Sequence, residues 1–136
     1  MDPTEQAIRE FYDARARRDW DRVGSLLADE VGWHEPGGNE VHAGDFRGRD
    51  EVVALLRELT TVTEGTFQLE PEGFLNLEEH SAVLVRWSAE RQGRRSAGHE
   101  IGVYRLHDGK ITDVWFYNEP SDTDAFSTVF AFRLIA

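Results

Sequence analysis

The chain has 136 residues, a formal net charge of -11 and no cysteine. Its length fits one domain, residues 1–136, that is large enough to bury a core and a small cavity. The negative charge argues against a nucleic-acid partner, which needs clustered Lys and Arg. The lack of cysteine excludes disulfides, thiolate catalysis and cysteine-ligated zinc.

The N-terminus is acidic and lacks the apolar stretch of a signal peptide, and no apolar run is long enough to cross a bilayer. We therefore expect a soluble, cytoplasmic protein without a membrane partner. The one basic cluster comprises Arg15, Arg17 and Arg18. Its acidic neighbours favour its interpretation as a solvated helix face.

The first third of the sequence predicts helices. Asp2 can cap a helix that starts at Pro3, and Asp19 can cap a short second helix. A third helix is expected from about Arg49. The apolar residues at helical spacing are Ile8, Phe11 and Tyr12 in the first helix, Trp20, Val23, Leu26 and Leu27 in the second, and Val52, Leu55, Leu56 and Leu59 in the third.

A brief strand, residues 31–35, precedes a Gly-rich segment through Asn39, His42 and Gly44. The rest of the chain predicts strands at residues 66–69, 74–77, 82–90, 98–106 and 111–118. Pro71 and Gly73 indicate a bulge or kink. Asp108-Gly109 is a strong hairpin signal, because these residues tolerate positive φ angles.

The segment from Asp124 is apolar enough to pack on the body or on a partner. Helices followed by a long antiparallel sheet indicate an α+β fold. Three helices laid across the mouth of a strongly curved sheet would make a cone with an interior pocket.

Several short motifs occur in a defined order and spacing along the chain: Arg18-Asp19-Trp20-Asp21, Leu26-Leu27-Ala28-Asp29-Glu30-Val31, Trp33-His34-Glu35-Pro36-Gly37, Phe46-Arg47-Gly48-Arg49-Asp50, and Asp108-Gly109-Lys110-Ile111 up to Trp115. With these motifs the chain resembles a known family, the SnoaL-like and ketosteroid-isomerase-like branch of the nuclear transport factor 2-like superfamily. The resemblance implies a cone-shaped α+β barrel. It also implies a homodimer formed through the outer face of the sheet.

The same resemblance bears on individual residues. The general-base Asp of ketosteroid isomerase directly precedes a Pro, and Glu35 before Pro36 takes that place. The isomerase's oxyanion-hole Tyr falls on Phe11, with Tyr12 next to it. Its second donor, a protonated carboxylic acid, falls on Gly102. Both donors are missing at these positions, which argues against steroid isomerisation by that mechanism. In SnoaL-like cyclases an inward carboxylate with His support leaves an acid–base role open.

Glu35 is the first candidate for a catalytic base, because an apolar cone would raise the pKa of its carboxyl group. The alternative is a solvated Glu at the end of a strand. His34 is the second candidate, yet strand alternation sends neighbouring side chains to opposite faces. We therefore expect only one of the two to reach the pocket.

A second His-Glu pair, His99-Glu100, raises the same question. The resemblance places Glu100 and Tyr104 inward and His99 outward, where it would serve at a dimer interface, although distortion near Gly98 could reverse this. On neighbouring strands Trp87, Phe116 and Asn118 are predicted to face inward. Trp115 and Tyr117 are predicted to face outward. Asn118 could orient a ligand carbonyl or bond the backbone.

No metal or other cofactor is expected. His34, Glu35, His42, Asp45 and His99 form a possible ligand inventory, but no two His show a ligand spacing on a helix or strand. We predict a domain that binds a small, apolar organic molecule.

As an enzyme it would isomerise, cyclise or dehydrate a carbonyl compound by proton transfer. The base would be Glu35 or His34, assisted by Tyr12, Asn118 or Glu100. The walls would be Trp33, Leu56, Trp87, Tyr104 and Phe116, with His99 nearby. The alternatives are a binding module without chemistry and an epoxide hydrolase. The latter would need an Asp/Arg/Asp-type set, for which Arg86 and Asp113 are predicted to face the wrong way.

Overall fold

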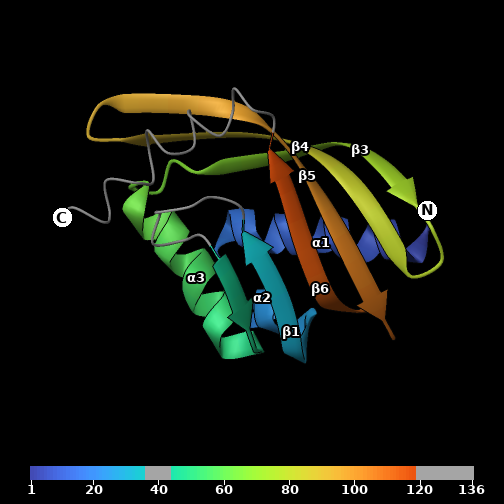
Figure 1. Ribbon diagram of the computed structural model, residues 1–136. Coiled ribbons are helices and arrows are strands. Elements are labelled where there is room, and N and C mark those ends of the chain that lie inside the picture. Colours follow the sequence, from blue (N-terminus) through green and yellow to red (C-terminus); the bar gives the residue numbers. More distant parts are fainter. Residues whose placement is uncertain (36–43, 119–136) are drawn as a thin grey trace.

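The computed structural model describes residues 1–35 and 44–118. Three helices and six strands lie in these residues (Figure 1): α1 (Pro3–Arg17), α2 (Trp20–Ser25), β1 (Leu27–Glu35), β2 (Gly44–Arg47), α3 (Arg49–Val62), β3 (Gln68–Asn76), β4 (His80–Arg91), β5 (Arg94–His107) and β6 (Lys110–Asn118). The apolar segment from Asp124 and most of the Gly-rich segment after Glu35 lie outside the described residues.

The helix starts follow the capping signals in the sequence. The Asp2 carboxylate accepts a hydrogen bond from the backbone N–H of Thr4 at 2.7 Å, one residue into the helix from Pro3. Asp19 accepts one from the N–H of Arg22 at 3.1 Å. Each carboxylate satisfies a backbone donor that the helix leaves unpaired. The predicted second helix is shorter than expected, because Leu26 caps its end and Leu27 already belongs to β1.

The six strands form one sheet in the order β2-β1-β6-β5-β4-β3. All neighbours are antiparallel except β1 and β6, which run parallel. The predicted bulge is present as a register shift between Pro71 and Gly73. The predicted tight turn is also present, with φ of 51° at Asp108 and 77° at Gly109.

Several strand predictions were incomplete. β1 starts four residues earlier than the predicted residue 31, β5 starts four residues earlier than the predicted residue 98, and β2 was not predicted at all. The strands predicted at residues 66–69 and 74–77 form one strand, β3. Three of the four residues of β2 are exposed. Such a strand carries no alternation of apolar and polar residues, so the sequence gives no periodic signal for it.

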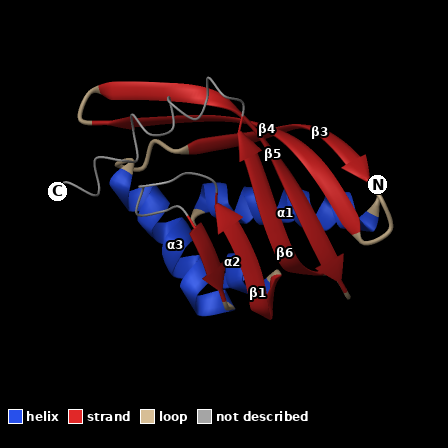
Figure 2. Ribbon diagram, in the orientation of Figure 1, coloured by secondary structure: helices blue, strands red, loops and turns tan. Residues whose placement is uncertain are grey.

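The helices cover one face of the curved sheet, as Figure 2 shows. The sheet does not close, because β2 and β3 remain as its two edges. This arrangement confirms the predicted cone-shaped α+β fold. No helix among the described residues is long and apolar enough to span a membrane.

The core lies between the helices and the inner face of the sheet. Strand alternation gives each strand a buried row, which is clearest in β4, where every second residue from Val83 to Ala89 is buried. The helices contribute the predicted apolar stripes, including Phe11, which is fully buried, and Leu56, which is 1% exposed. Trp33 and Trp87 are the largest fully buried side chains.

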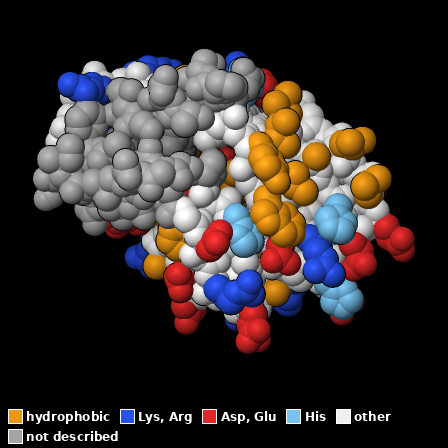
Figure 3. Space-filling model, in the orientation of Figure 1, with side chains coloured by type: hydrophobic (Ala, Val, Ile, Leu, Met, Phe, Trp, Pro, Cys, Tyr) orange, Lys and Arg blue, Asp and Glu red, His pale blue; other side chains and the backbone are white. Residues whose placement is uncertain are grey.

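The outer face of the sheet carries an exposed apolar row. Leu84, Ile101 and Tyr117 are paired across β4, β5 and β6, and they are 42%, 44% and 59% exposed. Figure 3 shows apolar side chains gathered on this face. The orientation of Tyr117 agrees with the prediction from strand alternation.

Candidate active site

Two glutamates, Glu35 on β1 and Glu100 on β5, reach the inner side of the sheet. Glu35 follows the buried Trp33 by two residues on β1, so both side chains lie on the same face. The Trp33 indole N–H donates a hydrogen bond to Glu35 Oε1 at 2.7 Å. Each glutamate is half-buried, and desolvation is the largest influence on the acidity of both carboxyl groups.

Burial changes the acidity of both carboxyl groups. Loss of solvent raises the pKa of Glu35 to about 7, although the Trp33 hydrogen bond and the charge of Arg15 oppose the rise. Burial, and then the negative charge of Glu35, raise the pKa of Glu100 to about 8. Because each ionised group disfavours ionisation of the other, the two titrate as a pair. Near neutral pH this pair can both take up and release a proton.

Arg15 supplies the positive charge of the site. Its charge acts on Glu35, Glu100 and Tyr12, lowering the pKa of each. Its guanidinium carbon lies 5.7 Å from the Phe11 ring centre and 5.8 Å from that of Trp33.

The interpretation of Arg15 as part of a solvated helix face was therefore wrong, although Arg17 and Arg18 are exposed. Its spacing was the available signal, because Arg15 follows Phe11 by four residues and Tyr12 by three, on the buried face of the helix.

Two tyrosine hydroxyls meet in the same interior. The hydroxyl of Tyr12 on α1 and that of Tyr104 on β5 are hydrogen-bonded to each other. Burial raises the pKa of both, so both keep their protons at neutral pH and can donate hydrogen bonds. The comparison with ketosteroid isomerase pointed to missing donors, yet this pair provides hydroxyl groups from other positions.

Gly102 makes room for this arrangement. A side-chain carbon added there would lie 2.8 Å from Cε1 of Tyr104 and 3.1 Å from Cε1 of Phe116. Those two rings thus occupy the space that the acidic side chain of the isomerase would need.

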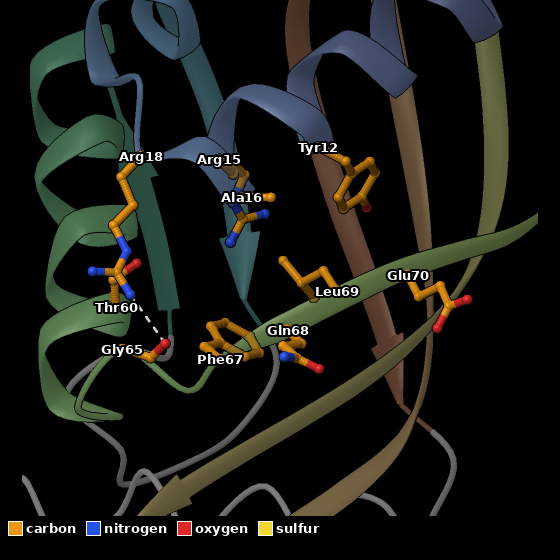
Figure 4. A pocket seen from close by; sticks show the side chains of 10 residues that line it. All are labelled: Tyr12, Arg15, Ala16, Arg18, Thr60, Gly65, Phe67, Gln68, Leu69 and Glu70. Atoms are coloured by element: carbon orange, nitrogen blue, oxygen red, sulfur yellow. Dashed lines mark hydrogen bonds between the residues drawn. The ribbon is translucent and has the colours of Figure 1, made fainter.

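A cavity of about 450 Å³ opens beside this cluster (Figure 4). It is enclosed by the second half of α1, the end of α3 and the first residues of β3. The lining residues are Tyr12, Arg15, Ala16, Arg18, Thr60, Gly65, Phe67, Gln68, Leu69 and Glu70. Only Tyr12 among the predicted site residues belongs to this lining. The expected apolar walls, Trp33, Leu56, Trp87, Tyr104 and Phe116, lie in the packed core instead.

His34 points away from this interior. Its Nδ1 lies 2.7 Å from Oδ1 of Asp45 on β2, and its ring stacks on Trp115 at 5.4 Å between ring centres. The structure thus separates the two candidates for the base, with Glu35 inside and His34 on the outer face.

The remaining predicted residues also divide between the two faces. His99 lies on the outer face, with Nε2 3.3 Å from Oε1 of Glu72, so it does not join the interior cluster. Asn118 is paired with Glu100 across β5 and β6. Among the residues that the structure describes, no group of His, Asp or Glu is arranged to hold a metal ion. His42 lies outside the described residues.

The comparisons with known proteins agree with this fold. The SnoaL-like domain family matches residues 8–114, and the chain belongs to this family. An uncharacterised protein of Mycobacterium tuberculosis is 31% identical over 121 residues, which cover 88% of this chain and 92% of the relative.

Solved structures of other proteins share the fold of this chain. Bal32a, from a soil-derived mobile gene cassette, matches with a TM-score of 0.87 and 24% identity over 94% of this chain and 96% of its own. An NTF2-like protein of unknown function from Burkholderia pseudomallei matches with a TM-score of 0.81 and 26% identity over 96% and 98%.

Two structures from M. tuberculosis share the fold at lower identity. One is a complex with estradiol-17β-hemisuccinate, with a TM-score of 0.76 and 16% identity over 90% of this chain and 98% of the other. The second is an LEH-like epoxide hydrolase, with a TM-score of 0.75 and 19% identity over 98% and 95%.

Proposed function

We propose that this SnoaL-like protein is a cofactor-independent enzyme that moves a proton on an apolar carbonyl compound, as an isomerase, cyclase or dehydratase. One observation carries the proposal: two enclosed carboxyl groups with raised pKa share an interior with a cation and two hydroxyl donors. A general base or acid works best when its pKa lies near the working pH, and Glu35 and Glu100 meet that condition.

The roles follow from the charges. Glu35 takes a proton from the carbon next to the carbonyl group, and the electrons move onto the carbonyl oxygen. Tyr12, which lines the cavity, donates a hydrogen bond to that oxygen while the buried Tyr104 hydroxyl donates to Tyr12, and Arg15 stabilises the negative charge that develops on the oxygen. Glu100, which holds its proton to higher pH, returns a proton to the product. Asn118, at the same end of the sheet as Glu100, orients the carbonyl compound.

Epoxide hydrolysis is a second candidate that one observation favours. The side chains of Glu35, Arg15 and Glu100 supply two acids and a cation in the interior. The sequence pointed only to Arg86 and Asp113 for such a set. Such a set can activate a water molecule with one carboxylate and protonate the epoxide oxygen with the other carboxylic acid. The epoxide hydrolase among the structural neighbours has the same fold.

We also propose that the protein forms a homodimer through the outer face of the sheet. Leu84, Ile101 and Tyr117 expose apolar surface there, and a contiguous apolar patch of this kind marks an interaction site. His34 and His99 lie on this face, which would make them interface residues. Sedimentation at several protein concentrations tests the dimer, and Ile101→Glu should convert it to a monomer.

The catalytic proposal is tested with the probe 2-tetralone, an apolar ketone with acidic protons beside its carbonyl. Exchange of those protons in D₂O is followed by NMR, with cyclohexene oxide as a parallel probe for epoxide opening. Glu35→Gln should slow exchange by about 100-fold or more, since a general base contributes about 10²–10⁴-fold.

Glu90→Gln, an exposed site on β4, is the matched control and should leave exchange unchanged. Diol formation from cyclohexene oxide without ketone exchange would favour the hydrolase. If neither probe is turned over, both enzymatic proposals fail and the protein is a binding module without catalysis. Loss of exchange in His34→Asn but not in Glu35→Gln would reverse the assignment of the base.

A further inference from the structure

The cavity beside α1 carries positive charge in a chain that is otherwise strongly acidic. Arg15 and Arg18 both extend from α1 toward residues 65–69, as Figure 4 shows. The Arg18 guanidinium donates a hydrogen bond to the carbonyl oxygen of Gly65 at 3.0 Å, which holds it at the cavity edge. The net charge of the whole chain is -11, so two cations at one cavity call for an explanation.

Arg15 faces aromatic rings, whereas several other arginines face carboxylates. Five arginines of the described residues pair with a carboxylate within 3.3 Å: Arg9, Arg17, Arg22, Arg49 and Arg86. Arg15, within the described ranges, faces aromatic rings and forms no such pair. A partly buried guanidinium retains several hydrogen-bond donors that can serve a ligand.

The nearby carboxyl groups do not fully neutralise this charge. Glu35 and Glu100 are enclosed, which favours their neutral forms. Glu70 lines the cavity, but its carboxylate binds the Arg86 guanidinium at 2.7 Å. The cavity therefore keeps a net positive charge in the pH range where Glu35 and Glu100 hold their protons.

An apolar wall completes the cavity. Ala16 on α1 faces the same space as Phe67 and Leu69, at the start of β3. A volume of about 450 Å³ lies in the range of small-molecule sites. Cations beside an apolar wall suit a molecule that has a flat hydrocarbon body and an acidic group.

We infer that this cavity binds an aromatic or alicyclic carboxylic acid, whose carboxylate pairs with the Arg15 guanidinium and whose rings lie against Phe67 and Leu69. The planar guanidinium matches the two oxygens of a carboxylate, and Arg18 adds a second charge at the edge. The inference deepens the proposed function by adding an anionic group to the carbonyl compound. It rests on the proposed function where the bound acid is the substrate.

The test compares two probes of nearly the same shape, 2-naphthoate and the neutral 2-naphthamide, by isothermal titration calorimetry at pH 6, below the pKa values of Glu35 and Glu100. Wild type should bind the carboxylate at least 10-fold more tightly than the amide. Arg15→Gln should abolish that preference, and Arg18→Gln should reduce it in part. Arg17→Gln is the matched control, because Arg17 lies on the same helix but points to solvent and pairs with Asp13.

Equal affinity of the wild type for the two probes would overturn the inference, and this result needs no variant. A preference that persists in a folded Arg15→Gln protein would also overturn it. The proposed catalysis fails separately: Glu35→Gln should lose ketone exchange and keep the preference for 2-naphthoate. Selective binding of 2-naphthoate without any ketone exchange would uphold the acid site and reject the enzyme.

Discussion

Glu35→Gln should make the protein more stable at alkaline pH. A carboxyl group whose pKa is raised in the folded state binds more protons folded than unfolded between the two pKa values, so stability falls as pH rises through that window. For Glu35 the window runs from the ordinary value of 4.5 to about 7, and for Glu100 to about 8. The stabilising contribution is complete below pH 4.5 and lost above pH 8.

The size of the effect follows from the shift. One pKa unit corresponds to about 1.4 kcal/mol, and a rise from 4.5 to about 7 therefore corresponds to about 3 kcal/mol. Part of this free-energy difference is already lost at pH 5, because Glu35 is mostly ionised in the unfolded chain at that pH. Between pH 5 and pH 9 the variant should gain about 2–3 kcal/mol over wild type. The glutamine oxygen can still accept the Trp33 N–H.

Urea unfolding at unit steps from pH 5 to pH 9, followed by circular dichroism, measures the difference in unfolding free energy between the two proteins. The difference cancels the pH dependence of shared groups that do not interact with Glu35, such as His107, whose pKa is raised by Glu79. Glu90→Gln should show a constant difference from wild type. A Glu35→Gln difference that stays within about 0.5 kcal/mol across this range would refute the enclosed, neutral carboxyl group.

Three further variants test the interior packing and the start of α1, each by urea unfolding at pH 7. Tyr104→Phe should lower the unfolding free energy by about 1–3 kcal/mol, because it leaves the buried Tyr12 hydroxyl without its partner. The control Tyr117→Phe, on the exposed outer face, should change it by less than about 0.5 kcal/mol. Equal effects of the two variants would contradict the buried pair. Gly102→Ala should cost about 1–3 kcal/mol, since the added methyl group would overlap the Tyr104 ring, and a neutral result would show that the ring moves aside freely. Asp2→Ala should cost about 1 kcal/mol by removing the helix cap, and Asp2→Asn, which keeps an acceptor, should restore most of it.

The fold was predictable from local signals. Caps at Asp2 and Asp19, and the turn at Asp108-Gly109, placed the element boundaries because each is set by one residue's own chemistry. Alternation along β1 correctly predicted that only one of Glu35 and His34 would reach the interior, but it did not decide which. The family resemblance, not alternation alone, correctly placed Glu100 inside and His99 outside.

The cavity was not predictable in the same way. The aromatic residues expected as walls, such as Trp33 and Phe116, pack against each other, at 5.1 Å between ring centres, and fill the core. The cavity forms instead where α1 leaves a gap to Phe67 and Leu69, and that gap depends on how three distant segments meet. Arg15 was missed because a run of arginines resembles a solvated face, although its helical position was correct for the interior.

The most direct test of the central claim is a pH titration of the glutamate side-chain carboxyl carbons by ¹³C NMR, in wild type, Glu35→Gln and Glu100→Gln. We expect two wild-type signals to titrate near pH 7–8, with one of them lost in each variant and the other shifted to lower pH once its neighbour's charge is gone. If every glutamate signal of the wild-type protein titrated below pH 5, the interior would hold no proton-exchanging pair, and the proposed chemistry would be contradicted.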